Sequence, residues 1–150
     1  MESSRAAEWQ RGEFRVSTNR KQFDVDAIHG FLCNSYWAQG IPRATVEKSI
    51  RGSLCFGMFY KNQQIGFARV ITDCATFAYL ADVFVLPGHC GKGLGKWMME
   101  CIMAHPELQG LRRWLLTTRD AHGLYEKSGF KLLAHPERFM EICRPAIYAQ

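Results

Sequence analysis

The sequence predicts a mixed α/β fold of the α+β type, with one sheet of about seven strands and about four flanking helices. Three runs with strand periodicity follow one another across short polar breaks, which makes most of the sheet antiparallel. Stretches with helical periodicity lie before and after these runs. The chain has 150 residues, of which 47% are apolar and 22% charged. This composition suits a single domain over residues 1–150, whose polar start, residues 1–12, we expect to be a loose tail.

The N-terminal part predicts one strand and two helices. The run Phe14-Arg15-Val16-Ser17 alternates apolar and polar residues, as a short strand does. Residues 24–36 carry an apolar stripe at helical spacing, and Asp24 is a suitable N-cap for that helix. The run Gly40-Ile41-Pro42 ends it, and a second helix is predicted over residues 43–51.

The central part predicts three consecutive strands, over residues 54–60, 65–72 and 77–85. Only short polar breaks, at 62–64 and 73–74, separate them. Connections this short join neighbouring strands as antiparallel hairpins.

The C-terminal part adds a crossover unit. Apolar residues recur at helical spacing over residues 94–104, and residues 114–117 are typical of a buried strand. A strand ending at Val85, followed by this helix and this strand, places two parallel strands side by side.

The last elements predicted are a helix over residues 121–128, capped by Gly129, and strands over residues 130–133 and 139–143 around a turn at Pro136. The final strand is expected at the edge of the sheet. An exposed edge strand could pair two copies of the chain as a homodimer.

The junction between the third central strand and the following helix is a candidate phosphate site. It reads Cys90-Gly91-Lys92-Gly93-Leu94-Gly95, and Lys96 follows. Free N–H groups at the start of a helix bind anions, and glycines allow a phosphate to approach closely. The alternative is that these glycines only shape a loop.

Two other nucleotide motifs do not fit this turn. The P-loop pattern Gly-x-x-x-x-Gly-Lys-Ser/Thr would place Cys90 at its first glycine and Trp97 at its hydroxyl residue. The dinucleotide pattern Gly-x-Gly-x-x-Gly would need a glycine at position 96, which is Lys96.

Two segments make the chain resemble the GNAT superfamily of N-acetyltransferases. The glycine turn is similar to the family's Gln/Arg-x-x-Gly-x-Gly/Ala, although Cys90 stands where the family usually has Gln or Arg. Downstream, the run Ala121-His122-Gly123-Leu124-Tyr125-Glu126-Lys127-Ser128-Gly129-Phe130 is similar to the family's Ala-x-x-Leu-Tyr-Glu-Lys-x-Gly-Phe. Thr118 stands where many members have Asn. The resemblance covers about residues 24–143 and implies a GNAT fold, whose parallel central pair of strands splays apart.

The resemblance also implies an enzyme that uses acetyl-CoA as cosubstrate. Such an enzyme transfers the acetyl group to a primary amine of a small molecule or peptide by direct attack. Tyr125 matches the tyrosine that acts as general acid toward the leaving thiolate. The residues that match the family's cofactor-binding positions are Val83, Phe84, Val85, Cys90, Gly91, Lys92, Gly93, Leu94, Gly95, Lys96 and Thr118. Backbone groups of 83–85 would hold the pantetheine and polarise the carbonyl.

Several roles stay open from the sequence. Asp82, near the splay, is the candidate catalytic base, directly or through water, or it only hydrogen-bonds and orients the substrate. Tyr125 could instead be a core aromatic residue. A histidine such as His122 titrates in the range useful for proton transfer, but His122 could also be a solvent-facing helix residue. Four aromatic residues are candidates for the acceptor pocket, or simply for the core: Phe31, Tyr36, Trp37 and Phe139.

The charge, hydropathy and cysteine content of the chain exclude several classes of partner. The formal net charge of +5 favours anionic ligands, but the basic residues are scattered and no nucleic-acid-binding signature is present. No apolar stretch is long enough to span a membrane, so neither nucleic acid nor membrane is expected as a partner. The six cysteines show no metal-ligand spacing, so we expect no metal, free thiols and a cytoplasmic location. A non-catalytic module that binds acetyl-CoA as a sensor is the alternative function, and a basic nucleic-acid-binding domain is a third.

Overall fold

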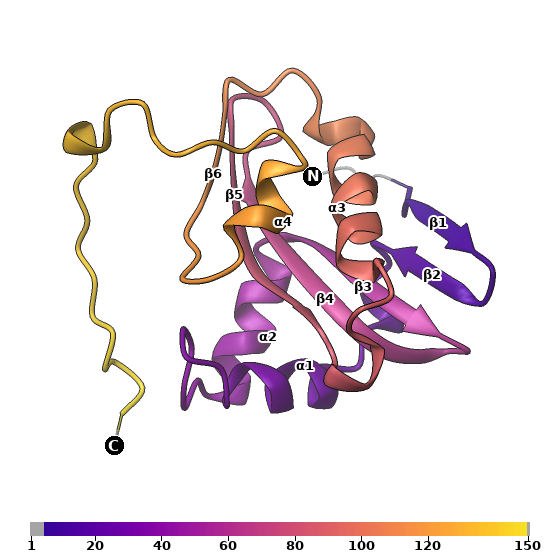
Figure 1. The fold of residues 1–150 in the computed structure, drawn as a ribbon. Coiled ribbons are helices and arrows are strands. Elements are labelled where there is room, and N and C mark those ends of the chain that lie inside the picture. Colours follow the sequence, from indigo (N-terminus) through magenta and orange to yellow (C-terminus); the bar gives the residue numbers. More distant parts are fainter. Residues whose placement is uncertain (1–4, 150) are drawn as a thin grey trace.

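The computed structural model describes residues 5–149, which form one six-stranded sheet with helices on both faces (Figure 1). The strands lie in chain order across the sheet, and every neighbouring pair is antiparallel except the last. The strands are β1 (Glu8–Arg11), β2 (Phe14–Ser17), β3 (Leu54–Tyr60), β4 (Gln63–Thr72), β5 (Phe77–Val85) and β6 (Arg113–Leu116). The α-helices are α1 (Val25–Leu32), α2 (Arg43–Arg51), α3 (Leu94–Ala104) and α4 (His122–Glu126). The mixed α/β fold predicted from the sequence is confirmed.

Each face of the sheet has its own core, because successive side chains of a strand point to opposite faces. On β4, Phe67 packs with α1 and α2, whereas its neighbour Ala68 packs with α3. The α3 side includes Met98 and Ile102, which are fully buried. Burying one side chain of this size contributes about 1.5–3 kcal/mol. The helices therefore hold the sheet from both sides.

The first strand corrects the expectation of a loose tail over residues 1–12. Residues 8–11 form β1, which pairs antiparallel with β2 across a two-residue turn at Gly12. Gly12 has φ +61°, a conformation that glycine adopts without strain. Trp9 packs against Phe56 and His105 of the α3-side core, with ring centroids 6.1 and 6.3 Å away. The polar sequence of residues 1–12 suggested a tail because a packing contact with residues far along the chain cannot be recognised from local sequence. Residues 1–4 lie outside the described residues.

The first helix is shorter than the predicted residues 24–36. Its N-cap is Asp24, as expected, whose side chain accepts a hydrogen bond from the Ala27 N–H. The helix ends at Leu32, because the Ser35 hydroxyl donates to the Leu32 carbonyl and accepts from the Ala38 N–H. The aromatic residues 36 and 37 therefore lie in the connection to α2, half exposed, rather than on a helix.

The parallel pair splays as the family resemblance implied. β6 pairs with β5 only from Phe77 to Leu80, although β5 continues to Val85. A bulge explains the divergence, because Asp82 and Val83 together stand opposite the single residue 68 of β4. Asp82 has φ +54°, which turns the strand at this point. The second half of β5 thus has no strand on its β6 side among the described residues.

The two last predicted strands are wrong for a single chain. Residues 130–133 and 139–143 pair with no strand, and every residue from 131 to 147 is exposed. Their apolar and β-branched residues favour extended structure, but a strand also needs a partner with free backbone groups. The segment leaves the body of the molecule after α4 and runs largely outside it (Figure 1), until Tyr148 packs against the core beside α1 and α2. The sheet therefore has six strands instead of about seven, with β6 at its edge.

Candidate active site

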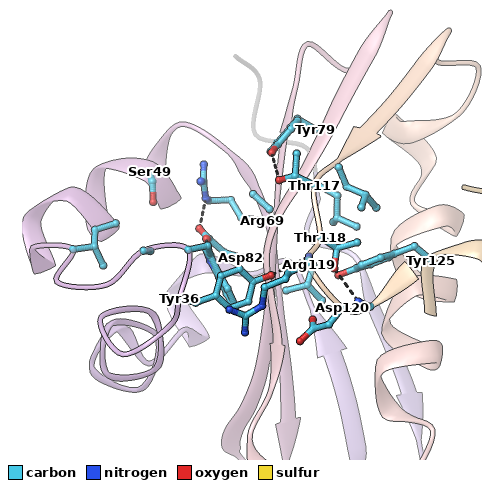
Figure 2. Close-up of a pocket in the computed structure, with 18 of the residues that line it drawn as sticks. Tyr36, Ser49, Arg69, Tyr79, Asp82, Thr117, Thr118, Arg119, Asp120 and Tyr125 are labelled. Atoms are coloured by element: carbon cyan, nitrogen blue, oxygen red, sulfur yellow. Dashed lines mark hydrogen bonds and ion pairs between the residues drawn. The ribbon is translucent and has the colours of Figure 1, made fainter. Parts of the chain in front are cut away.

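A cavity of about 620 Å³ opens where β5 and β6 diverge. Its walls come from the bulge of β5, the end of β6 with the loop after it, and the connection between α1 and α2 (Figure 2). Four residues predicted for the site from sequence line it together: Asp82, Val83, Thr118 and Tyr125. Figure 2 shows Asp82 and Tyr125 on opposite sides of the cavity.

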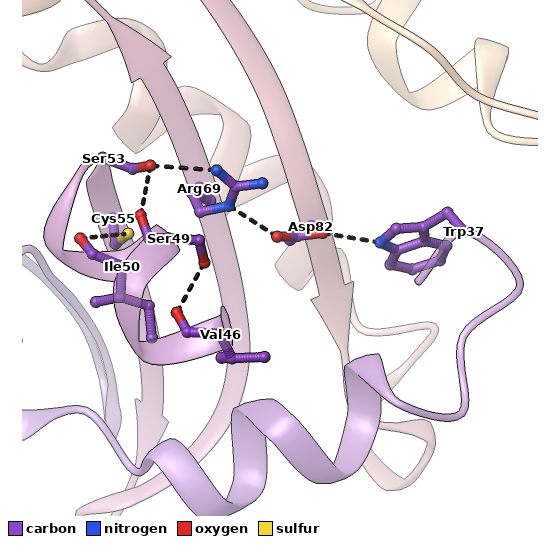
Figure 3. Close-up of polar contacts among 8 residues, drawn as sticks. All are labelled: Trp37, Val46, Ser49, Ile50, Ser53, Cys55, Arg69 and Asp82. Atoms are coloured by element: carbon purple, nitrogen blue, oxygen red, sulfur yellow. Dashed lines mark hydrogen bonds and ion pairs between the residues drawn. The ribbon is translucent and has the colours of Figure 1, made fainter. Parts of the chain in front are cut away.

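Asp82 is held in place by two hydrogen-bond donors (Figure 3). The Arg69 Nε donates to Asp82 Oδ2 at 2.8 Å, and the Trp37 Nε1 donates to Oδ1 at 2.9 Å. The Arg69 and Asp82 side chains are only 18% and 10% exposed. A second Arg69 nitrogen donates to the Ser53 hydroxyl at 3.2 Å, which fixes the guanidinium.

This arrangement bears on what the Asp82 carboxylate can do. Each carboxylate oxygen has two lone pairs, so each can accept one hydrogen bond beyond those that Arg69 and Trp37 donate. A buried ion pair also resists the loss of one partner, because the other charge is then left uncompensated. The carboxylate is therefore placed to receive a hydrogen bond from a cationic or N–H donor in the cavity.

Tyr125 lies on α4 with its ring half-buried against the α3-side core and 6.1 Å from the Phe130 ring. Burial raises the pKa of its hydroxyl, and the neighbouring Tyr36 and the Asp120 carboxylate raise it further. A raised pKa keeps the phenol protonated through the physiological range. Tyr125 can therefore donate a proton or a hydrogen bond into the cavity.

The glycine turn lies at the end of β5, beyond the cavity lining. Gly91 and Gly93 have φ +81° and +73°, and a side chain added to either would meet no atom within 4 Å. Gly93 is the N-cap of α3, so no side chain caps the first N–H groups of this helix. Successive N–H groups of a turn that contains left-handed residues can form a concave anion-binding site. Lys92 and Lys96, both exposed, add positive charge beside it.

Three further predicted cofactor residues differ in what they offer to a ligand. Cys90 is exposed, and its thiol donates back to the carbonyls of Val85 and Leu86 at 3.4 and 3.5 Å. Phe84 is buried and stacks on Phe31 at 4.0 Å, so only its backbone is available to a ligand. Thr118 lies in the loop before α4, where its hydroxyl accepts a hydrogen bond from the N–H of the helix N-cap, Ala121, at 3.0 Å.

The structure separates the four aromatic residues that were candidates for an acceptor pocket. Tyr36 and Trp37 line the cavity, whereas Phe31 packs in the core and Phe139 lies away from the cavity under Arg113. Arg69 was not among the residues predicted for the site. Its position within an apolar strand could have indicated a buried ion pair, because a buried arginine needs an anionic partner.

The rim of the cavity carries further charge. The Arg119 guanidinium lies 3.8 Å from the centre of the Tyr36 ring, and the Arg119 N–H donates to the Tyr36 hydroxyl at 3.2 Å. A cation over an aromatic face at this distance is attractive. These contacts connect the loop after β6 to the loop after α1 and close one side of the cavity.

Within residues 5–149, no three His, Cys, Asp or Glu side chains are arranged to hold a metal ion. All six cysteines are free thiols. No helix in the same range is long and apolar enough to cross a membrane.

Comparison with known proteins identifies relatives of this site and fold. Residues 51–132 match the model of the acetyltransferase (GNAT) domain. A protein of Gibberella zeae, named provisionally as an acetyltransferase, is 36% identical over 143 residues, covering 80% of each chain. A crystal structure from Xanthomonas campestris pv. campestris, provisionally an acetyltransferase of the GNAT family, is 50% identical with a TM-score of 0.89. That match covers 91% of this chain and 97% of the other.

A more distant structure shares the fold. It is a Clostridium acetobutylicum protein, assigned as an acetyltransferase by prediction and determined with acetyl-CoA. It is 12% identical, with a TM-score of 0.61 over 93% of this chain and 95% of the other.

Proposed function

The chain belongs to the GNAT acetyltransferase family, and from this premise we propose that it transfers the acetyl group of acetyl-CoA to a primary amine of a small molecule or peptide. The observation that carries the proposal is one continuous arrangement along β5. After β5 ends at Val85, the short turn at 87–89 leads to the glycine turn and the start of α3, and the splayed half of β5 lines a cavity between Asp82 and Tyr125.

The described residues fit acetyl-CoA. Among the described residues no side chain caps the start of α3, and the two left-handed glycines and two lysines beside it suit a pyrophosphate. Within the described part of the chain, the backbone of Val83 to Val85 has no strand partner on its β6 side, so it can hydrogen-bond an extended pantetheine. The shared fold of the Clostridium acetobutylicum protein determined with acetyl-CoA gives further support.

Acetyl-CoA supplies an activated acetyl thioester. In our proposal Asp82, fixed by Arg69 and Trp37, accepts a hydrogen bond from the acceptor amine and orients its lone pair. The amine nitrogen forms a bond to the thioester carbonyl carbon as the carbon–sulfur bond breaks, and the amine releases one proton to water. The Tyr125 hydroxyl gives its proton to the departing sulfur and is then reprotonated from solvent. Backbone N–H groups at 83–85 stabilise the carbonyl oxygen.

The role of Asp82 can be tested by Asp82→Asn. We expect the KM for the amine to rise about 10- to 100-fold, because a hydrogen bond to a charged group contributes about 1.5–3 kcal/mol. The kcat should change less. Steady-state kinetics over amine concentration separates the two parameters, with Asp26→Asn on the exposed face of α1 as the control.

A different outcome would change this assignment. A large fall in kcat with an unchanged amine KM would mean that Asp82 is the base and not an orienting group. Unchanged kinetics would remove Asp82 from the site.

The departure at Cys90 gives a second prediction. Cys90 occupies the position of a polar family residue and is exposed at the start of the turn. Cys90→Arg should tighten acetyl-CoA binding about two- to fivefold at low salt, because a partly exposed charge pair contributes up to about 1 kcal/mol. Calorimetric titration at two salt concentrations measures this. Equal or weaker affinity would show that position 90 does not face the cofactor.

The alternative function is an acetyl-CoA-sensing module without turnover, which the loss of a polar anchor at Cys90 favours. Saturable thermal stabilisation by acetyl-CoA is expected for enzyme and sensor alike. Stabilisation by nucleic acid alone would contradict both. We further propose a cytoplasmic protein whose partner is its amine acceptor, without nucleic acid or membrane, and which forms a homodimer.

A further inference from the structure

One nitrogen of the Arg69 guanidinium is not used by the contacts that hold Asp82. The Arg69 Nε donates to Asp82, and the Arg69 Nη1 donates to the Ser53 hydroxyl. Among the described residues, Nη2 has no hydrogen-bond partner, and it is not fully buried. Figure 3 shows this third nitrogen beside the two that are bonded. The Arg69 side chain is 18% exposed and lines the cavity, so Nη2 can meet a ligand there.

The orientation of the Asp82 carboxylate explains why Nη2 is left over. Nε and Nη2 donate from one edge of the planar guanidinium, which a carboxylate frequently takes with both of its oxygens. Here the Trp37 Nε1 donates to Oδ1 at 2.9 Å, so only Oδ2 accepts from Arg69, at 2.8 Å from Nε. An acceptor oxygen and an unused donor therefore lie side by side at the cavity wall.

The charge around this ion pair favours an additional anion. The Arg20 guanidinium donates to the Ser53 carbonyl at 2.9 Å, and the hydroxyl of the same serine accepts from Arg69. Among the described residues, Asp82 is the only carboxylate paired with either arginine. Two cations thus share one carboxylate, and the Arg69–Asp82 pair is largely buried, where screening by salt is weak. A ligand with a negative charge on Nη2 would balance the excess.

We propose that the acceptor is an α-amino acid, whose amine binds Asp82 while its carboxylate binds the Arg69 Nη2. This inference rests on the proposed function, because it names the class of acceptor for the same site. A single carbon joins the amine and the carboxylate of an α-amino acid, which suits a donor and an acceptor on adjacent groups of one ion pair. The bound ammonium loses one proton to water before attack, and the transfer then proceeds as described above to give the N-acetylamino acid.

Two analogues of an amino acid lack one feature each. The amine without a carboxyl group leaves Nη2 without a partner, and the carboxamide offers only a neutral oxygen. Charge-assisted hydrogen bonds are about twice as strong as neutral ones. The site should therefore prefer the free amino acid to both analogues.

The test is calorimetric titration of the full chain, in the presence of CoA, with L-phenylalanine, L-leucine and L-glutamine and with both analogues of each. Affinities are compared instead of rates, because the three kinds of ligand differ in the basicity of their amines. For the side chain that binds best, the amino acid should bind about tenfold more tightly than either analogue, or better. Equal or tighter binding of the analogues, or no binding of any amino acid, would overturn the proposal.

Arg69→Lys isolates the second donor. Lysine keeps a positive charge beside Asp82 but lacks the planar edge with two donors. The preference for the amino acid over its carboxamide should fall to about twofold or less, whereas the affinity for the carboxamide should change less. Arg119→Lys, at the cavity rim, is the matched variant and should keep the preference. Loss of the preference in Arg119→Lys but not in Arg69→Lys would place the carboxylate at the rim and overturn the proposal. Unchanged circular dichroism confirms the fold of both variants, and the comparison of ligands on the wild type depends on neither.

The outcome is separable from that of acetyl transfer. Thiol release from acetyl-CoA with amines that lack a carboxylate, and none with amino acids, would support acetyl transfer and overturn this inference. Preferential binding of amino acids that Arg69→Lys abolishes, without thiol release, would support the assignment of Arg69 and contradict the transfer.

Discussion

Tyr125→Phe is expected to lower kcat about 100-fold or more, with little change in the affinity for acetyl-CoA. The substitution removes only the hydroxyl, and a positioned general acid contributes about 10²- to 10⁴-fold to rate. The ring contacts with Phe130 and the α3-side core remain, so the fold should be unaffected. Stopped-flow and steady-state measurement of thiol release give kcat directly.

The pH dependence supplies the second readout for Tyr125. A general acid works in its protonated form, so activity is lost as the pH rises through its pKa. Because burial, Tyr36 and Asp120 raise this pKa, the alkaline fall attributable to Tyr125 should lie above the ordinary tyrosine value of about 10. This fall should be absent from Tyr125→Phe. Tyr79→Phe is the matched control, because Tyr79 lines the same cavity and its hydroxyl is hydrogen-bonded to Thr117. Equal rates for Tyr125→Phe and wild type at every pH would exclude the acid role.

The double variant G91A/G93A is expected to weaken acetyl-CoA binding roughly 100-fold. Both glycines have positive φ, which costs an L-residue about 1–2 kcal/mol at each position. The added methyl groups meet open space, so strain and not collision is the cause. The backbone can relieve this strain by moving to negative φ, which turns the N–H groups away from the phosphate position. Calorimetric titration with acetyl-CoA measures the loss.

Gly88→Ala is the control for this effect. Gly88 lies in the short turn just before, has no positive φ and also faces open space. Its substitution should leave the acetyl-CoA affinity unchanged. If G91A/G93A bound as tightly as Gly88→Ala, the turn would not be the pyrophosphate site.

The elements that were predicted correctly are those in which the local sequence pattern favours the same conformation as the packing against neighbouring elements. Residues 94–104 form α3 because the apolar side of this helix packs on the central sheet of the same chain. Residues 77–85 form β5, although no pattern in the sequence revealed the bulge at Asp82. The bulge depends on how two strands pair, and periodicity within one strand carries no information about pairing.

The errors lie where a contact between distant residues decides the structure. Trp9 turns an expected tail into β1 by packing on Phe56, 47 positions further along the chain. Residues 139–143 have a strand pattern, but the edge that could receive them is not filled within the chain. A local sequence pattern predicts the conformation that a segment favours. Whether the segment becomes a strand also depends on a neighbouring strand with free backbone groups.

The candidate site shows the same division. The glycine turn was predicted from its own pattern and Tyr125 from the family resemblance, because both belong to short contiguous motifs. Asp82 was a candidate through its position near the splay that the resemblance implied. The ion pair that holds Asp82 could not be derived, since Arg69 and Asp82 meet only through the antiparallel pairing of β4 and β5. The Trp37 contact depends on where α1 ends, which is set by local hydrogen bonds of Ser35.

The most direct test of acetyl transfer is the release of free CoA thiol from acetyl-CoA by the wild-type chain, measured against a panel of small amines and peptides. Our account predicts saturable release that requires a primary amine and yields the acetylated amine in equal amount. Binding of acetyl-CoA without amine-dependent thiol release across the panel would contradict it and would favour the sensing module.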